Sequence, residues 1–143
     1  MSDMPTDKHH PSVESLDQKT REEWVKMSTR AVAANVGPWP CRFNKELGAA
    51  AQSEPHSPLA PAYRLWMADN LAREARYSEA VRAYDSAVDS AQSAHRLLLR
   101  VDPISCSLLH KAQAATISGD AKLAISTYRE LAAVSSEAAG PFF

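Results

Sequence analysis

The sequence predicts an all-α protein built from antiparallel helical hairpins, and three observations support this prediction. The nine prolines leave three long proline-free windows, 12–37, 62–102 and 104–140. An internal proline costs a helix about 3 kcal/mol, so helices are expected within these windows. The four glycines lie mostly at window ends, where a left-handed helix cap favours glycine. Alternation of β-branched residues never persists for five positions, so strand signals are nearly absent.

The N-terminal part of the chain is expected to hold one helix of about 20 residues and a short second helix. Ser15 is the expected N-cap of the first helix, with Gln18 three residues later, and Asn44 is the expected cap of the second. The stretch from Glu54 to Pro61 is expected to be a proline-rich linker. We therefore divide the chain into residues 1–61, an arm with a helix that packs against the rest, and residues 62–143, two helical hairpins.

The C-terminal part divides into four predicted helices. Ser78 is a reasonable N-cap after a break at residues 75–79, and the following helix is expected to run for about six turns, to Asp102. Pro103 is expected at the first position of the next helix, where its missing N–H costs nothing. The turn at 118–120 then separates this helix from the last one.

An internal repeat joins these helices into two similar units. Residues 76–88 align with residues 120–132 at an offset of 44, which matches alanine, an aliphatic residue and tyrosine in both copies. A period between 20 and 50 residues is typical of stacked supersecondary units. The small side chains of Ala80 and Ala124 are expected to face an adjoining helix, and Tyr84 and Tyr128 to fill the gap to the next layer.

The repeat resembles the tetratricopeptide repeat. The second-helix signature of that family is matched by the segment Tyr77-Ser78-Glu79-Ala80-Val81 together with Tyr84 and Ala87. The longer spacing of 44 residues is similar to the extended repeats of kinesin light chain and of some bacterial regulators, and the resemblance covers about residues 62–136. It implies a short solenoid, completed either by the N-terminal region as a third hairpin or by a partner that covers the open end.

The resemblance also implies a binding surface, because this family holds peptides or protein surfaces in a groove lined by the first helices of its repeats. In this sequence the groove positions are Leu65, Asp69, Ala72, Arg73, Leu109, Gln113, Thr116 and Ile117. Family members that clamp acidic chaperone tails use Lys, Arg and Asn in the groove, and Leu65 with Asp69 does not supply them, so that type of adaptor is not expected. Further aromatic anchors are Trp39, Phe142 and Phe143, which alternatively fold back onto their own helices.

Composition narrows the classes of partner. The 16 basic and 17 acidic residues nearly cancel, and no Lys/Arg block is present, which disfavours nucleic acid as a partner. The longest apolar runs are far shorter than the ~20 residues that cross a bilayer, and the N-terminus has no apolar signal core. We therefore expect a soluble protein, not secreted, in the cytoplasm or an organelle matrix.

Patterns that carry chemistry are few. The sequence has no glycine-rich phosphate loop, no Ser/His/Asp arrangement and no His-Glu-x-x-His motif, so we expect no catalysis and no cofactor. Cys106 and His110 share a helix face, but two ligands do not make a metal site. The leading hypothesis is a non-catalytic scaffold, either an adaptor or a small accessory subunit of a larger assembly. The alternative is a histidine phosphotransfer-like bundle that uses His95, which resembles the His-x-Leu start of those domains.

Overall fold

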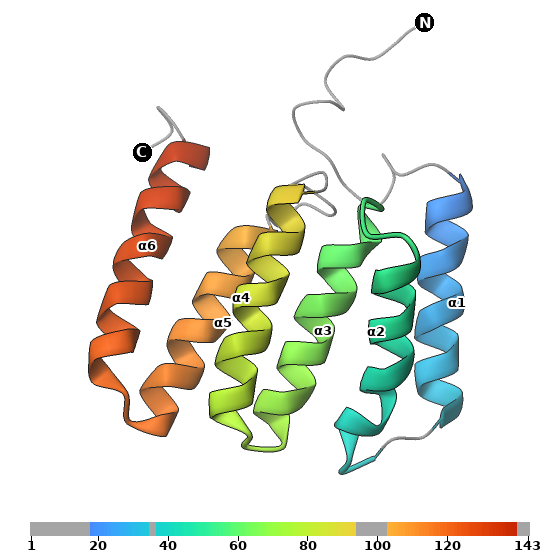
Figure 1. The fold of residues 1–143 in the computed structure, drawn as a ribbon, viewed down its shortest axis with the longest axis horizontal. Helices are drawn as coiled ribbons and strands as arrows, with labels where there is room; N and C mark the ends of the chain where they lie inside the picture. The colour runs from blue at the N-terminus through green and yellow to red at the C-terminus, as the bar shows by residue number, and fades with distance from the viewer. Residues whose placement is uncertain (1–17, 35–36, 94–102, 140–143) are drawn as a thin grey trace, which may run out of the picture.

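The computed structural model describes residues 18–34, 37–93 and 103–139, and within these ranges the protein is all-helical, with no strand (Figure 1). The prediction of an all-α protein is confirmed. Neighbouring helices run antiparallel, and from α2 onward each helix packs against the next one in the chain. The elements are α1 (Gln18–Ala34), the 3-10 helix η3 (Pro40–Phe43), α2 (Asn44–Ser53), α3 (Leu59–Arg73), α4 (Tyr77–Ser93), α5 (Pro103–Ser118) and α6 (Ala121–Ala139).

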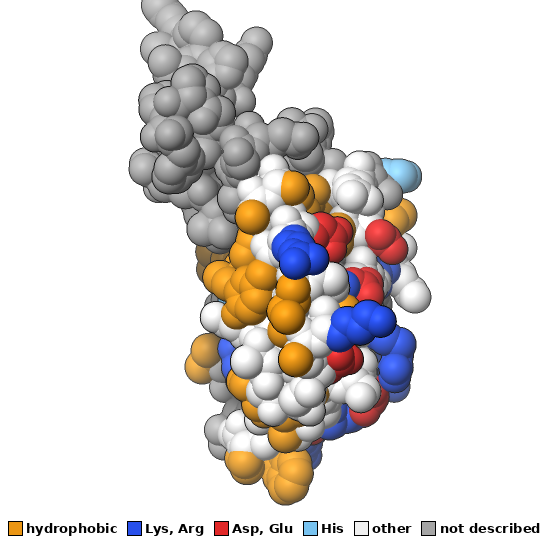
Figure 2. Space-filling model, turned by 90° about the vertical axis from the view of Figure 1, so that its left-hand side faces the viewer, with side chains coloured by type: hydrophobic (Ala, Val, Ile, Leu, Met, Phe, Trp, Pro, Cys, Tyr) orange, Lys and Arg blue, Asp and Glu red, His pale blue; other side chains and the backbone are white. Residues whose placement is uncertain are grey.

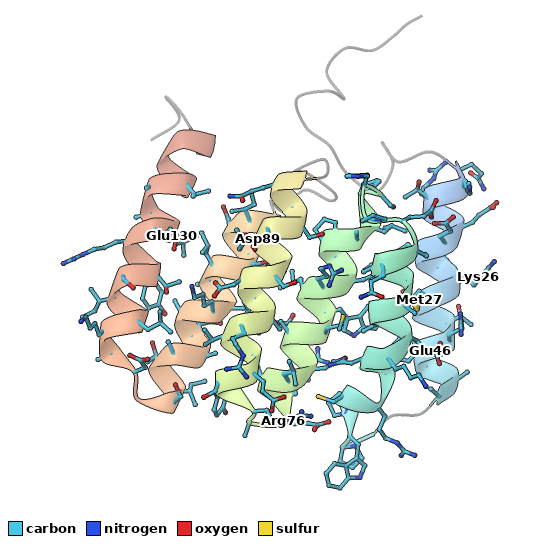
Figure 3. All side chains as sticks on the ribbon, in the orientation of Figure 1. Lys26, Met27, Glu46, Arg76, Asp89 and Glu130 are labelled. Carbon is cyan, nitrogen blue, oxygen red and sulfur yellow. The ribbon has the colours of Figure 1, made fainter. Side chains whose placement is uncertain are left out.

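The N-terminal helices share one hydrophobic cluster with the start of α3. Its buried members are Met27, Phe43, Leu47, Ala51, Leu59, Ala60 and Tyr63. Met27 lies on the side of α1 that faces α2, and Lys26 lies on the opposite side (Figure 3). Trp24 of α1 stacks on Tyr63 of α3, with ring centroids 6.0 Å apart. Large aromatic side chains therefore bridge α1 to the rest of the stack.

The two C-terminal hairpins, α3–α4 and α5–α6, are held together by small buried side chains. Ala68 and Ala80 of the first hairpin are fully buried, as is Ala112 of the second, and Ala124 is 6% exposed. The prediction that Ala80 and Ala124 face an adjoining helix is therefore confirmed. Because alanine adds little bulk, the backbones can approach closely at these positions.

The turns of the two hairpins have the same geometry at an offset of 44 residues. Ala75 and Gly119 both adopt positive φ, at 61° and 88°. The next amide donates back across the turn in each case, from Arg76 to the Leu71 carbonyl at 3.0 Å and from Asp120 to the Ala115 carbonyl at 2.9 Å. This is the Schellman arrangement that ends a helix. The sequence repeat is therefore also a structural repeat at these turns.

Three details of the sequence prediction are wrong. Asn44 does not cap α2, because its amide donates to the Met67 carbonyl at 3.3 Å and its oxygen accepts from Asn70 at 2.9 Å, which ties α2 to α3. Ser78 lies inside α4, which already begins at Tyr77. The expected linker ends early, since α3 begins at Leu59 and takes Pro61 into its first turn, where a proline removes no helical hydrogen bond.

Two further predictions for the helix ends are confirmed, and two others concern residues that the structure does not describe. Pro103 begins α5, and the Asp120 carboxylate accepts the backbone N–H of Leu123 at 3.1 Å, as a helix cap does. Ser15 and the predicted end of the long helix at Asp102 lie outside the described residues.

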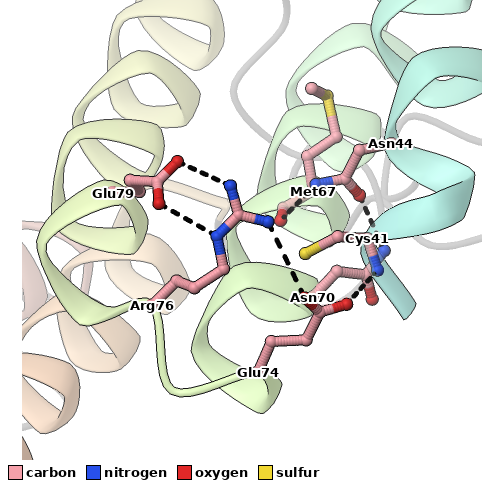
Figure 4. A network of polar contacts seen from close by, with 7 residues as sticks. All are labelled: Cys41, Asn44, Met67, Asn70, Glu74, Arg76 and Glu79. Atoms are coloured by element: carbon pink, nitrogen blue, oxygen red, sulfur yellow. Dashed lines mark hydrogen bonds and ion pairs between the residues drawn. The ribbon is translucent and has the colours of Figure 1, made fainter. Parts of the chain in front are cut away.

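A polar network joins η3 to the α3–α4 turn (Figure 4). The backbone N–H of Cys41 donates to the Glu74 carboxylate at 2.8 Å, and this bond lowers the pKa of Glu74. Arg76 forms two hydrogen bonds with the Glu79 carboxylate, at 2.9 and 2.8 Å. The Arg76–Glu79 pair is exposed, so it adds little to stability. The Cys41–Glu74 bond instead fixes where the N-terminal helices meet the first hairpin.

Candidate functional site

A cleft of 360 Å³ opens between α3, α4 and α5. Helix α3 contributes one acidic and one basic side chain to the cleft, α4 contributes two tyrosines, and α5 contributes polar and apolar side chains. The lining residues are Asp69, Ala72, Arg73, Tyr77, Tyr84, His110, Gln113, Ala114 and Ile117. The cleft therefore combines charged groups with apolar surface, as ligand sites commonly do.

One carboxylate oxygen at the base of the cleft joins all three helices. The hydroxyl of Tyr84 on α4 donates to Oδ1 of Asp69 on α3 at 2.6 Å. The Nδ1 of His110 on α5 lies 2.8 Å from the same oxygen. The two rings also contact each other edge to face, with centroids 6.0 Å apart. The Tyr84–Asp69–His110 network therefore fixes the relative position of the helices that form the cleft.

The protonation states within this network follow from its geometry. The hydrogen bond to Asp69 raises the pKa of His110 to about 10, with a further contribution from Cys106, whose Sγ lies 3.8 Å from Nε2. His110 is therefore an imidazolium at neutral pH, and its Nδ1 is a donor to Asp69. Burial, followed by the bond to Asp69, raises the pKa of Tyr84, so the phenol stays protonated.

The charge of the cleft is set by a third group. The charges of Asp69 and protonated His110 offset one another, which leaves the cation of Arg73 in excess. Arg73 is exposed, and one of its amino groups donates to the side-chain oxygen of buried Asn70 at 2.9 Å. The guanidinium is therefore held at the cleft in a defined position.

Most of the groove residues predicted from the sequence meet in this cleft. The five that line it together are Asp69, Ala72, Arg73, Gln113 and Ile117. Leu65 instead packs against the core cluster around Ala68 and Tyr84. Leu109 and Thr116 are exposed but do not belong to the lining.

The aromatic anchors lie apart from the cleft. Trp39, which precedes η3, is exposed over 60% of its surface and does not line the cleft. Phe142 and Phe143 lie outside the described residues, as does His95, so the alternative phosphotransfer site is not described.

Four cleft residues were not predicted as site residues: Tyr77, Tyr84, His110 and Ala114. The pairing of Asp69 with His110 spans 41 residues and depends on how α5 settles against α3. The available signal was the repeat, which places Tyr84 where the next hairpin must cover it. The repeat pattern predicts a packing role for Tyr84, and the structure shows that its hydroxyl also donates to Asp69.

Over residues 18–34, 37–93 and 103–139, no group of three or more His, Cys, Asp or Glu side chains is arranged to hold a metal ion. The thiol of Cys106 contacts His110, but Cys106 does not line the cleft. The Tyr84–Asp69–His110 network joins α3, α4 and α5 as a clamp. No helix in this described part is both long and apolar enough to span a bilayer.

A second cleft of 180 Å³ lies between α1, α2 and the start of α3. Its charged lining residues are of both signs: Glu23, Lys26, Arg30 and Glu54. Arg30 also forms an ion pair with Glu46 of α2. This smaller cleft carries no excess charge and none of the predicted groove residues, so the α3–α4–α5 cleft is the stronger candidate.

Comparison with known proteins found no family model, no curated protein and no solved structure that matches this chain.

Proposed function

We propose that this chain is a non-catalytic protein–protein interaction module of the tetratricopeptide-repeat type, which holds a segment of a partner protein in the α3–α4–α5 cleft. It would act as an adaptor or as a small accessory subunit of a larger assembly. The observation that carries this proposal is the meeting of five predicted groove residues in one cleft. Four of them form two pairs of equivalent positions, Asp69 with Gln113 and Arg73 with Ile117, each pair 44 residues apart.

The chemistry of the cleft favours a particular kind of partner segment. Arg73 offers an unmatched cation, and Ile117 offers apolar surface that is 67% exposed. A segment with a carboxylate next to an apolar side chain would complement both. A volume of 360 Å³ accommodates a few side chains and not a folded surface.

The clamp beneath the cleft supports binding without catalysis. Because Tyr84 and His110 both bind Asp69, the three helices are already fixed in position before a partner arrives. Preorganisation of this kind lowers the entropic cost of binding. The charged groups of the clamp satisfy one another, which suits a recognition surface better than a reactive site.

Affinity capture with quantitative mass spectrometry tests this proposal. The bait is the full chain, compared with Ile117→Asp and Arg73→Glu in the cleft. Matched controls are Val32→Asp on α1, which changes an exposed valine, and Arg82→Glu on α4, which changes an exposed arginine away from the cleft lining. We expect a specific partner to be depleted about tenfold or more by the cleft variants alone.

Melting curves of Ile117→Asp, Val32→Asp and Arg82→Glu should resemble that of the unchanged chain, since each substitution is at an exposed position. Arg73→Glu also removes the hydrogen bond to buried Asn70, so its melting temperature should fall slightly, and Ile117→Asp is the cleft variant without this effect. Equal capture of every partner by the cleft variants and the controls would contradict the proposal.

A further inference from the structure

Exposed large hydrophobic side chains gather on the last hairpin. Within the described residues they include Leu109 and Ile117 on α5, and Ile125 and Tyr128 on α6. Figure 2 views the molecule from this end, and hydrophobic side chains run along the face formed by α6, with charged side chains gathered toward one flank. We call the exposed side of α6 the α6 outer face, defined by Lys122, Ile125, Tyr128, Arg129 and Ala132.

The internal repeat shows what would cover this face. Tyr128 is equivalent to Tyr84 at the offset of 44 residues, yet Tyr128 is 42% exposed and Tyr84 is 2% exposed. Ala132 is exposed, whereas its equivalent, Val88, is buried. The same residue pattern is therefore core in the first hairpin and surface in the second.

Helix α5 is the element that covers these positions in the first hairpin. The ring of His110 contacts Tyr84 edge to face, and Ala114 belongs to the same core cluster. Lys111 completes the contact with an ion pair, its Nζ lying 2.7 Å from Oδ1 of Asp85 on α4. The covering element is thus a helix with small and apolar side chains and a charge opposite to that at position 85.

That charge is reversed at the equivalent position of the second hairpin. Asp85 aligns with Arg129, which is exposed, and Lys122 adds a second cation one turn from Ile125. A helix that covers α6 as α5 covers α4 needs a carboxylate where α5 has Lys111. Two α6 outer faces, by contrast, would bring the cations of both copies together, which disfavours a second copy as the occupant.

We infer that the α6 outer face docks an amphipathic helix of a partner protein, and that this helix carries a carboxylate opposite Arg129. It packs small and apolar side chains over Ile125 and Tyr128, in the register that α5 uses on α4. The inference rests on the packing of α5 against α4 and does not require the proposed cleft function.

A peptide probe copied from the chain itself tests the inference. The two probes are the α5 segment, residues 103–118, and the same peptide with Lys111→Glu, each titrated against the full chain by fluorescence anisotropy. An isolated helix of this length is marginal in water, so binding must also order the peptide and will be weak. The ratio of the two affinities is therefore the informative quantity.

We expect the Lys111→Glu peptide to bind about threefold to fivefold more tightly than the unchanged peptide, as for one exposed ion pair. Arg129→Glu in the full chain should reverse this preference, and Ile125→Asp should abolish binding of both peptides. The matched control Val32→Asp, an exposed valine on α1, should leave binding unchanged. A probe that instead displaced the chain's own α5 would meet Asp85, so the unchanged peptide would bind better.

Three results would overturn the inference. They are no binding of either peptide, equal binding that Arg129→Glu does not alter, and preference for the unchanged peptide. Self-association of the chain that Ile125→Asp removes, measured by native mass spectrometry, would also overturn it by assigning the face to a second copy. Because Arg129→Glu is expected to gain affinity for one peptide, a binding loss from misfolding cannot be mistaken for support.

Discussion

The hairpins α3–α4 and α5–α6 share one residue pattern, but among the described helices only the first hairpin is covered by a further helix, α5. Both turn through a residue with positive φ, Ala75 in the first and Gly119 in the second, and both bury an alanine in the following helix. Tyr84 is core because α5 covers it, whereas Tyr128 faces outward. The difference shows that a position in a stacked repeat becomes core only when the next unit is present.

The largest expected effect separates the two tyrosines. Tyr84→Ala removes a buried ring and its hydrogen bond to Asp69, so it should lower the free energy of unfolding by about 3–5 kcal/mol. Tyr128→Ala should cost only about 1 kcal/mol, because Tyr128 is 42% exposed whereas Tyr84 is 2% exposed. Urea denaturation of both variants measures the free energy of unfolding. Equal losses of free energy would contradict the assignment of Tyr84 to the core and of Tyr128 to the surface.

The small residues should behave alike in both hairpins. Ala80→Leu and Ala124→Leu each insert bulk between packed helices and should destabilise the fold by about 1–3 kcal/mol. Ala121→Leu is the control, at an exposed position in the same helix as Ala124, and should change stability by less than about 0.5 kcal/mol. Thermal melts followed by circular dichroism measure these differences. A stable Ala80→Leu variant would show that the helices do not approach closely there.

A pH dependence should arise where the two hairpins meet, because Asp69 of α3 binds His110 of α5, whereas Gln113 stands at the position equivalent to Asp69. The folded pKa of His110, about 10, is above its unfolded value near 6.5. Its contribution to stability is therefore complete below about pH 6.5 and is lost as the pH rises toward 10. Asp69→Asn should lower the pKa of His110 and weaken this loss, and should itself cost about 1–2 kcal/mol at neutral pH.

Urea denaturation at pH 6, 8 and 9.5 compares the unchanged chain with Asp69→Asn. An NMR titration of the His110 ring measures its pKa directly. A His110 pKa near the ordinary value in the unchanged chain would contradict the assigned role of Asp69.

The smallest effect should come from the two turns. Ala75 adopts a positive φ, which is strained for alanine and not for glycine. Ala75→Gly should therefore stabilise the fold by about 0.5–1 kcal/mol. Gly119→Ala should destabilise it by about 1 kcal/mol through the backbone alone, because a Cβ there would meet no atom within 4 Å. Chemical denaturation of both variants should give shifts of opposite sign.

Much of the fold could be predicted from the sequence because it depends on local rules. Proline placement marks the helical windows, and Ala80, Ala124 and Tyr84 of the repeat mark buried positions, whereas Tyr128 is exposed. The start of α3 was predicted late because Pro61 was treated as the end of a linker, although a proline fits the first turn of a helix. Asn44 was assigned to a cap because its contacts to Met67 and Asn70 depend on a helix later in the chain.

The cleft could be predicted only in part. Five lining residues follow from the resemblance to the tetratricopeptide repeat, which implies a groove lined by the first helices of the repeats. Leu65 packs against the core cluster around Ala68 and Tyr84, and the resemblance does not say which part of the α3 face this cluster takes up. The contact of Asp69 with both Tyr84 and His110 depends on the packing of three helices, and no local pattern encodes it.

Hydrogen–deuterium exchange of a captured complex tests most directly whether the cleft holds the partner. Peptides that cover residues 69–77 and 110–117 should gain protection from exchange on binding. Peptides from α1, which carries the exposed Val25 and Val32, should exchange as in the free chain. Protection confined to α1 and α2, with the cleft unchanged, would contradict the account.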